Sequence, residues 1–307
     1  MSRSPLLRML HGVLLAGAPF ALSDCLGTSS CPDNGWEPPL AETRVVDASL
    51  ADGGPLDATQ CDQVCEGFGD SVVTCVRDSA ESVLCFKRPF PCEGRRPAGL
   101  RATRSAARSG FDCHLADAAW LEAASVEAFR VLRRELRAHG APRHLLRAAS
   151  RSARDERRHA RVTKGLARRF GVAVAPVRRD STQPRSLAAL ALENAVEGCV
   201  RETWGALLAL RQGLRATEPT LRAAMARIAR DEVRHAELAW SVDAWVRPRL
   251  SADECRRLRE ERARAVTELR RDVVCSLPRA ERERLGLPGA HEALQLLLLL
   301  QQSLGLA

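Results

Sequence analysis

The chain has 307 residues, of which 45% are hydrophobic and 28% charged, and its formal net charge is +9 at pH 7. This length and composition are those of a folded protein with at least one large core, and no stretch reaches the roughly 20 apolar residues of a membrane-spanning helix. The arginines are spread through helices among acidic residues and accompany no nucleic-acid motif, so we expect a solvated helical surface and no nucleic-acid partner.

Residues 1–23 have the features of an export signal. Two arginines precede the apolar run Met9–Leu22, and small residues then lead to a cleavage point before Asp24. A second interpretation is a lipoprotein signal in which Cys25 is acylated and attaches the protein to a membrane, and a third is an uncleaved, poorly ordered N-terminus. We expect an exported protein of the periplasm or cell envelope.

Cysteine is concentrated in the first third of the chain. Eight of the 11 cysteines lie between Cys25 and Cys113, a density typical of disulfide-bonded exported proteins. Residues 24–60 are rich in Pro, Gly, Asp and Ser and predict a tether. Residues 61–110 predict a small disulfide-rich module with short strand-like runs, followed by a linker. A zinc site there is disfavoured because the module has no histidine and its cysteine spacings are irregular.

Helical periodicity begins near residue 111 and continues to the end of the chain. Within 111–250 we expect four helices, over residues 115–139, 143–170, 186–217 and 219–246. Residues 251–307 hold further helices. One begins at Ser251 with a capping box to Glu254 and runs to about Cys275, and an apolar one covers His291–Leu304.

The links between the four helices differ in length. The 14 residues from Val172 to Arg185 reach about 46 Å when extended, whereas a helix of about 25 residues is only about 38 Å long. The other two links are tight. Short, long and short links predict an all-α four-helix bundle with one long crossover.

The pattern Asp-Glu-x-Arg-His-Ala occurs twice, at residues 155–160 and 231–236. In each copy the glutamate and the histidine are three residues apart and therefore share one face of a helix. These pairs are Glu156 with His159 and Glu232 with His235.

A further glutamate precedes each copy at a similar distance. Glu122 lies 34 residues before Glu156, and Glu197 lies 35 residues before Glu232, which suggests a duplicated helical hairpin. All these polar side chains interrupt apolar stripes, so folding would bury them. Because buried unpaired carboxylates are costly, two divalent cations are an effective way to neutralise four of them.

One glutamate from each of two helices, with Glu-x-x-His from each of the other two, resembles the di-iron pattern of ferritin-like bundles. Residues 115–247 resemble that superfamily, most closely its rubrerythrin-like and exported ferritin-like members. The resemblance implies a ferritin-like bundle over 111–250 that holds two iron ions, with manganese as an alternative. The implied ligands are Glu122, Glu156, His159, Glu197, Glu232 and His235.

Four other acidic residues lie close to these positions in the sequence. Glu202 is a candidate additional ligand and Glu193 a candidate for the layer around the ligands. Asp155 and Asp231 each precede a ligand glutamate, and we expect them to hydrogen-bond a ligand histidine across the bundle. Exposed pairing with arginine is the alternative for both.

The resemblance implies a centre that reacts with oxygen or peroxide, and hence an oxidoreductase. The absence of tyrosine excludes a tyrosyl-radical role, and no Cys-x-x-Cys pair is present to serve as a built-in electron relay. The alternative is a non-enzymatic metal-binding protein of the envelope whose disulfide-rich module binds a partner. Substrate, electron donor and oligomeric state are left open.

Overall fold

The computed structural model divides the chain into two compact units, Gly17–Pro89 on the one hand and Met1–Ala16 with Phe90–Ala307 on the other. The structure describes residues 4–16, 42–45, 73–77, 82–87, 95–101, 110–180, 183–273 and 277–305. These residues are mainly helical, as the sequence predicts.

In the smaller unit the described residues form a three-stranded antiparallel sheet with strand order β1-β3-β2. The strands are β1 (Glu42–Val45), β2 (Val73–Arg77) and β3 (Ser82–Lys87). The register places Cys75 opposite Cys85. β1 lies within residues 24–60, which the sequence predicts to be a tether. Residues 42–45 instead form a strand, because their backbone pairs with β3. The predicted disulfides of this unit lie outside the described side chains and stay a prediction.

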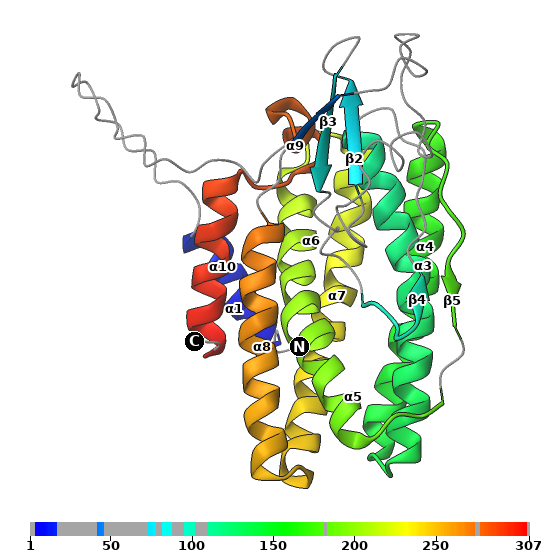
Figure 1. The fold of residues 1–307 in the computed structure, drawn as a ribbon, viewed down its shortest axis with the longest axis vertical. Helices are drawn as coiled ribbons and strands as arrows, with labels where there is room; N and C mark the ends of the chain where they lie inside the picture. Colours follow the sequence, from blue (N-terminus) through cyan, green and yellow to red (C-terminus); the bar gives the residue numbers. More distant parts are fainter. Residues whose placement is uncertain are drawn as a thin grey trace, which may run out of the picture. The chain divides into compact units, whose positions relative to one another are not determined.

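The larger unit contains four long helical segments packed as a bundle (Figure 1). The segments are α3 (Gly110–Ala138), α4 (Arg143–Arg169), the continuous run α5 (Leu187–Glu193), η2 (Asn194–Glu202) and α6 (Thr203–Arg215), and α7 (Pro219–Val246). α3 packs on α4, and α6 on α7. The third segment differs from the expected uninterrupted α-helix because η2 is a π-helix, a wider turn often found at functional sites.

The links follow the predicted order of short, long and short. α3 turns into α4 through Gly140, whose φ of 70° lies in the left-handed region that favours glycine. The long link after α4 runs beside α3 and α4 (Figure 1). It contains β5 (Arg178–Arg179), which pairs antiparallel with β4 (Leu100–Arg101) and so ties the segment before α3 to the bundle.

Further helices lie beside these four. They are α1 (Pro5–Ala16), α8 (Ala252–Asp272), α9 (Arg279–Leu285) and α10 (Ala290–Leu304). The predicted capping box of Ser251 and Glu254 is confirmed at the start of α8. α1 packs against α10 and lies inside the stretch predicted as an export signal, so cleavage there would remove it. No helix in the described part of the chain is both long and apolar enough to cross a membrane.

The buried apolar residues of the bundle form two clusters at different levels along its axis. On α3, Leu115 belongs to one cluster and Phe129 to the other, and Glu122 lies between them. On α4, Ala153 and Leu166 belong to different clusters, and the first Glu-x-x-His motif lies between these two residues. The helices therefore carry a polar layer in the middle of an otherwise apolar core.

Candidate metal centre

The polar layer brings together four of the six predicted ligands. One ligand atom each from Glu122, Glu156, His159 and Glu232 lies within 4.8 Å of the others, and all four residues are buried. They come from α3, α4 and α7, because the three-residue spacing within each motif turns its glutamate and histidine toward the same face.

The fifth predicted ligand, His235, mirrors His159. Nδ1 of His159 is 3.0 Å from Oε1 of Glu232 and 3.7 Å from Oε2 of Glu156. Nδ1 of His235 is 3.0 Å from Oε1 of Glu156 and 3.5 Å from Oε2 of Glu232. Each of these two carboxylates therefore offers one oxygen to each imidazole, and the ring centroids are 5.8 Å apart. This is an arrangement in which both carboxylates lie between two ligand sets.

The remaining predicted ligand, Glu197, does not join the cluster. Its Oε2 accepts a hydrogen bond from the backbone N–H of Arg96 at 3.1 Å, and its Oε1 is 3.6 Å from Nε of Arg201. Glu202, from the same helical segment, is also a candidate ligand. That side chain is fully buried, and its charge interacts with those of His235 and the ligand glutamates. Glu202 stands at the end of the π-helix, where the wider turns change which residues share a face.

Many polar atoms of this layer are buried without a hydrogen-bond partner. The imidazole Nδ1 atoms lie close to carboxylate oxygens but not in hydrogen-bond geometry. Native proteins rarely leave buried polar atoms unsatisfied unless an ion or water completes them. The unsatisfied atoms include both oxygens of Glu156 and of Glu202, Oε2 of Glu122, Oε1 of Glu232, and Nδ1 of His159 and of His235.

Burial and mutual repulsion decide the protonation of this layer. Burial, reinforced for Glu122 by the neighbouring Glu156 carboxylate, raises the pKa values of Glu122 and Glu202 well above the usual range. Burial acts in the same direction on Glu232, but the His235 and His159 imidazoles lower the pKa of Glu232 to about 2. The layer thus holds carboxyl groups of both kinds, neutral and ionised.

The carboxylates around the two histidines favour the protonated forms of these side chains. Burial alone would lower the pKa values of His159 and His235, but the surrounding carboxylates raise both well above the usual value. The pKa of Glu156 is lowered, because its contacts with the imidazoles outweigh burial and repulsion by Glu232. Two imidazolium ions then balance two carboxylates, and metal binding would displace the protons.

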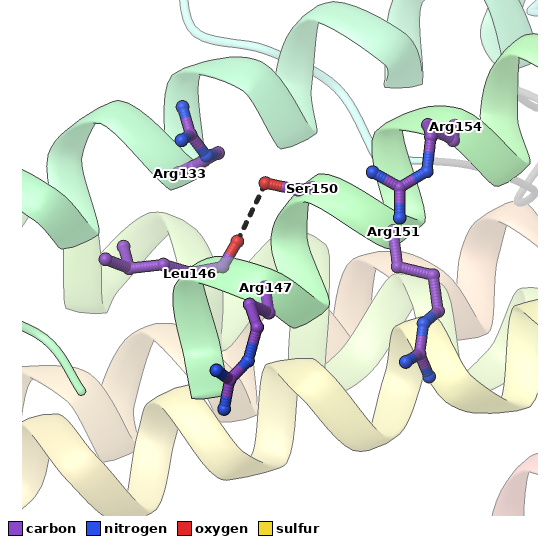
Figure 2. A pocket seen from close by; sticks show the side chains of 6 residues that line it. All are labelled: Arg133, Leu146, Arg147, Ser150, Arg151 and Arg154. Carbon is purple, nitrogen blue, oxygen red and sulfur yellow. Dashed lines mark hydrogen bonds between the residues drawn. The ribbon is translucent and has the colours of Figure 1, made fainter. Parts of the chain in front are cut away.

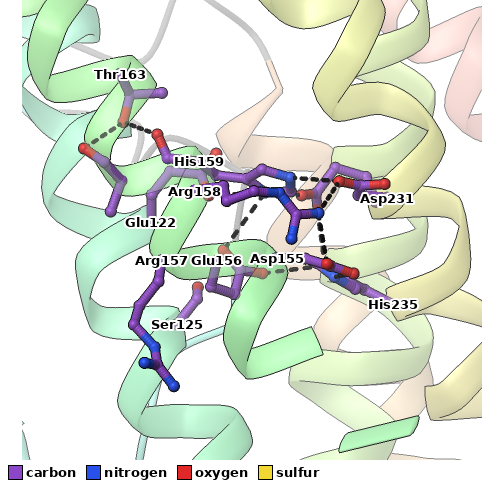
Figure 3. Close-up of polar contacts among 12 residues, drawn as sticks. Glu122, Ser125, Asp155, Glu156, Arg157, Arg158, His159, Thr163, Asp231 and His235 are labelled. Atoms are coloured by element: carbon purple, nitrogen blue, oxygen red, sulfur yellow. Dashed lines mark hydrogen bonds and ion pairs between the residues drawn. The ribbon is translucent and has the colours of Figure 1, made fainter. Parts of the chain in front are cut away.

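Each histidine is oriented by an aspartate from the other copy of the motif. Nε2 of His159 is hydrogen-bonded to Oδ2 of Asp231 at 3.1 Å, which confirms the cross-bundle role predicted for Asp231 (Figure 3). Nε2 of His235 lies 3.7 Å from Oδ2 of Asp155, which is within ion-pair distance but makes no hydrogen bond. A carboxylate on Nε2 fixes the ring so that Nδ1 faces the ligand carboxylates.

The motif arginines link the two aspartates. Arg158 donates to Oδ1 of Asp155 at 2.6 Å and to Oδ2 of Asp231 at 3.0 Å. Arg234 donates to Oδ2 of Asp155 at 3.2 Å and also to Asp231. The histidine and arginine contacts overcome burial and lower the pKa of Asp231 to about 2, so this carboxylate is ionised. The repeated arginine thus holds the orienting layer together.

A buried arginine from the segment before α3 closes another side of the layer. Nε of Arg95 donates to Oε1 of Glu193 at 2.8 Å, and its Nη1 donates to Oδ1 of Asn194 at 3.2 Å. The Arg95 carbonyl accepts from the Ser125 hydroxyl at 3.0 Å. Arg185 also pairs with Glu193, so Glu193 neutralises arginine and lies outside the ligand cluster. No sequence signal singles out Arg95, which stands in the predicted linker.

Comparison with protein-family models, curated proteins and solved structures finds no match to this chain. The ferritin-like resemblance therefore rests on the two sequence motifs and on the buried cluster of glutamates and histidine that could hold a metal ion.

Proposed function

We propose that this chain binds two iron ions and is an oxidoreductase that reacts with oxygen or peroxide. The observation that carries the proposal is the buried layer in which two histidines face the same two glutamates from opposite sides. The proposed ligands are Glu122, Glu156, His159, Glu202, Glu232 and His235, with Glu202 in the place that the sequence pattern assigns to Glu197.

The charge of the four buried glutamates supports a site that holds two cations. Four buried glutamates would carry four negative charges once their protons are displaced, and two divalent ions supply the matching positive charge. The unsatisfied oxygens and nitrogens are lone-pair donors aimed into one layer. A plain bundle would instead pair such acids with arginine, as Glu193 is paired here with Arg95 and Arg185.

The donor set suits iron or manganese. Carboxylate and imidazole bind both metals, whereas thiolate would favour zinc or copper(I). Cys199 of the third helical segment is buried but does not belong to the group of ligand atoms. Bound iron would supply one-electron steps and positions open to a small oxidant. The chain itself holds the ligand rings in place through Asp231 and keeps water out with Phe129, whose ring is 5.0 Å from that of His235.

The test is anaerobic loading of the full-length protein with Fe(II), followed by metal analysis and absorption spectra before and after oxygen is added. We expect about two irons per chain and new absorption bands after oxygen. The isosteric Glu156→Gln/Glu232→Gln variant should lose the iron. The control variant Asp253→Asn/Glu260→Gln, which changes two exposed carboxylates of α8, should keep it.

Three outcomes are distinct. Stoichiometric iron that responds to oxygen and is lost only in the buried variant supports the proposal. A site that binds zinc as well as iron and ignores oxygen would favour a structural metal site in a non-enzymatic protein. A protein that takes up no iron, and whose stability does not change when iron is added, would contradict the metal assignment.

A further inference from the structure

A second polar feature lies on the outer face of the α3–α4 hairpin. It is a hollow of about 240 Å³ whose side chains come from both helices (Figure 2). Its lining consists of Arg133, Leu146, Arg147, Ser150, Arg151 and Arg154. Four of these six residues are arginines and none is acidic, so the hollow is strongly positive.

The helical spacing explains how the arginines gather. Arg147, Arg151 and Arg154 follow one another at intervals of four and three residues along α4, and therefore stand on one face. Arg133 reaches the same hollow from α3. Leu146 adds an apolar wall, and the Ser150 hydroxyl donates to its carbonyl at 2.9 Å.

The four arginines are exposed, and none of them pairs with a carboxylate in the described part of the chain. Other arginines of the same two helices do find partners, as Arg130 does with Glu127 and Arg158 with Asp155. Four like charges around one hollow repel each other, and an anion placed among them would remove that repulsion.

We propose that this hollow binds a phosphate-bearing ligand with two or more negative charges. Guanidinium groups bind phosphate oxygens through paired N–H donors, and several arginines around one cavity are suited to more than one such group. The volume is below that of most pockets for drug-sized ligands, so it fits a compact group such as pyrophosphate. The lining contains no aromatic side chain on which a nucleic-acid base would stack.

The same phosphate chemistry occurs in a free metabolite and in a lipid headgroup, and two binding assays separate these sources. The first is calorimetric titration of the full-length protein with pyrophosphate. The second is co-sedimentation with phosphatidylglycerol vesicles, compared with phosphatidylcholine vesicles. Neither depends on the proposed metal centre, because the hollow shares no residue with the ligand set.

Two double variants, each lacking two arginine charges, test whether binding depends on the hollow or on net charge. Arg147→Gln/Arg151→Gln removes two charges from the hollow. Arg227→Gln/Arg230→Gln removes two exposed α7 charges that likewise have no carboxylate partner among the described residues and that do not line this hollow. We expect the first variant to weaken binding at least about tenfold, as the loss of one or more charged hydrogen bonds would, and the second less than about twofold.

Selective loss in the pyrophosphate assay assigns a free phosphate ligand, and selective loss only with the anionic vesicles assigns a headgroup. Either result supports the site, provided that circular dichroism shows both variants to be folded. Absence of saturable binding in both assays would overturn the proposal. Equal weakening by the two variants would also overturn it, because the effect would then belong to net charge alone.

Discussion

Asp231 and His159 are hydrogen-bonded at 3.1 Å although they belong to different copies of the same motif, on α7 and α4. Each copy thus supplies a buried histidine and an aspartate that contacts the histidine of the other copy. The duplicated motif works as one unit, because neither copy contains the aspartate that its own histidine contacts.

The Asp231→Asn substitution should therefore weaken metal binding while the ligands remain. Loss of an orienting carboxylate costs about 10- to 100-fold in metal affinity. Asp155→Asn should cost less, because the Asp155 contact with His235 is longer, at 3.7 Å. Anaerobic Fe(II) titrations would measure both, with the exposed Asp253→Asn as control. Equal affinities in all three variants would contradict an orienting role.

Glu202 and Glu197 should respond differently to the same change. We expect Glu202→Gln to reduce bound metal from about two ions per chain to about one, because it removes a buried carboxylate that we propose as a ligand. Glu197→Gln should leave two, because that carboxylate contacts Arg96 and Arg201 instead. Metal analysis of both variants after desalting would measure the number of ions per chain. About two ions in Glu202→Gln and about one in Glu197→Gln would contradict the assignment of Glu202 as the ligand.

The stability of the metal-free protein should fall as the pH rises. Glu122 and Glu202 have pKa values raised above the usual 4.5, so above that pH the folded state binds more protons than the unfolded state. His159 and His235 add the same effect above their usual 6.5. The free energy of unfolding therefore decreases from about pH 4.5 upward, as each raised pKa is approached.

Metal loading should suppress this loss, because it replaces the protons. Thermal unfolding of the metal-free and iron-loaded proteins at several pH values between 5 and 9 would measure the difference. Parallel curves for the two forms would mean that the ligand layer does not control the pH dependence.

Removal of the buried Arg95 guanidinium should destabilise the bundle. Arg95→Met leaves Glu193 with a single arginine partner, and we expect a loss of about 1–3 kcal/mol. Arg101→Met breaks only an exposed ion pair with Asp180, and should change stability much less, because solvent screens that pair. Urea unfolding measures both. Adding Glu193→Gln to Arg95→Met should recover part of the loss, and strict additivity would argue against coupling between the two residues.

Two helical glycines offer a test of the packing around the π-helix. A Cβ at Gly198 would lie 2.7 Å from Cβ of Ala239 and 2.9 Å from Oδ1 of Asn194, so Gly198→Ala should destabilise the protein by about 1–3 kcal/mol. A Cβ at Gly165 would meet nothing within 4 Å, and Gly165→Ala should stabilise α4 by about 0.5–1 kcal/mol. Urea unfolding should therefore show changes of opposite sign in the free energy of unfolding of the two variants. Changes of the same sign would contradict the tight approach at Gly198.

Local patterns in the sequence were enough to predict the four helical segments of the bundle, their order of short and long links, the capping box at Ser251 and five residues of the buried polar layer. These features depend on spacings of three, four or seven residues, which a single helix converts directly into a shared face. The two motifs lie within such spacings, and the sequence therefore predicts that His159 and His235 share a helix face with their glutamates.

Only the tertiary structure shows that the third helical segment contains a π-helix. Periodicity assumes an unbroken α-helix, whereas the structure has the wider helix over Asn194–Glu202 and buries Glu202 fully. The contact of the buried Arg95 with Glu193 joins residues 98 positions apart. Such contacts depend on how whole helices pack and where buried charge is neutralised, and no local spacing encodes either.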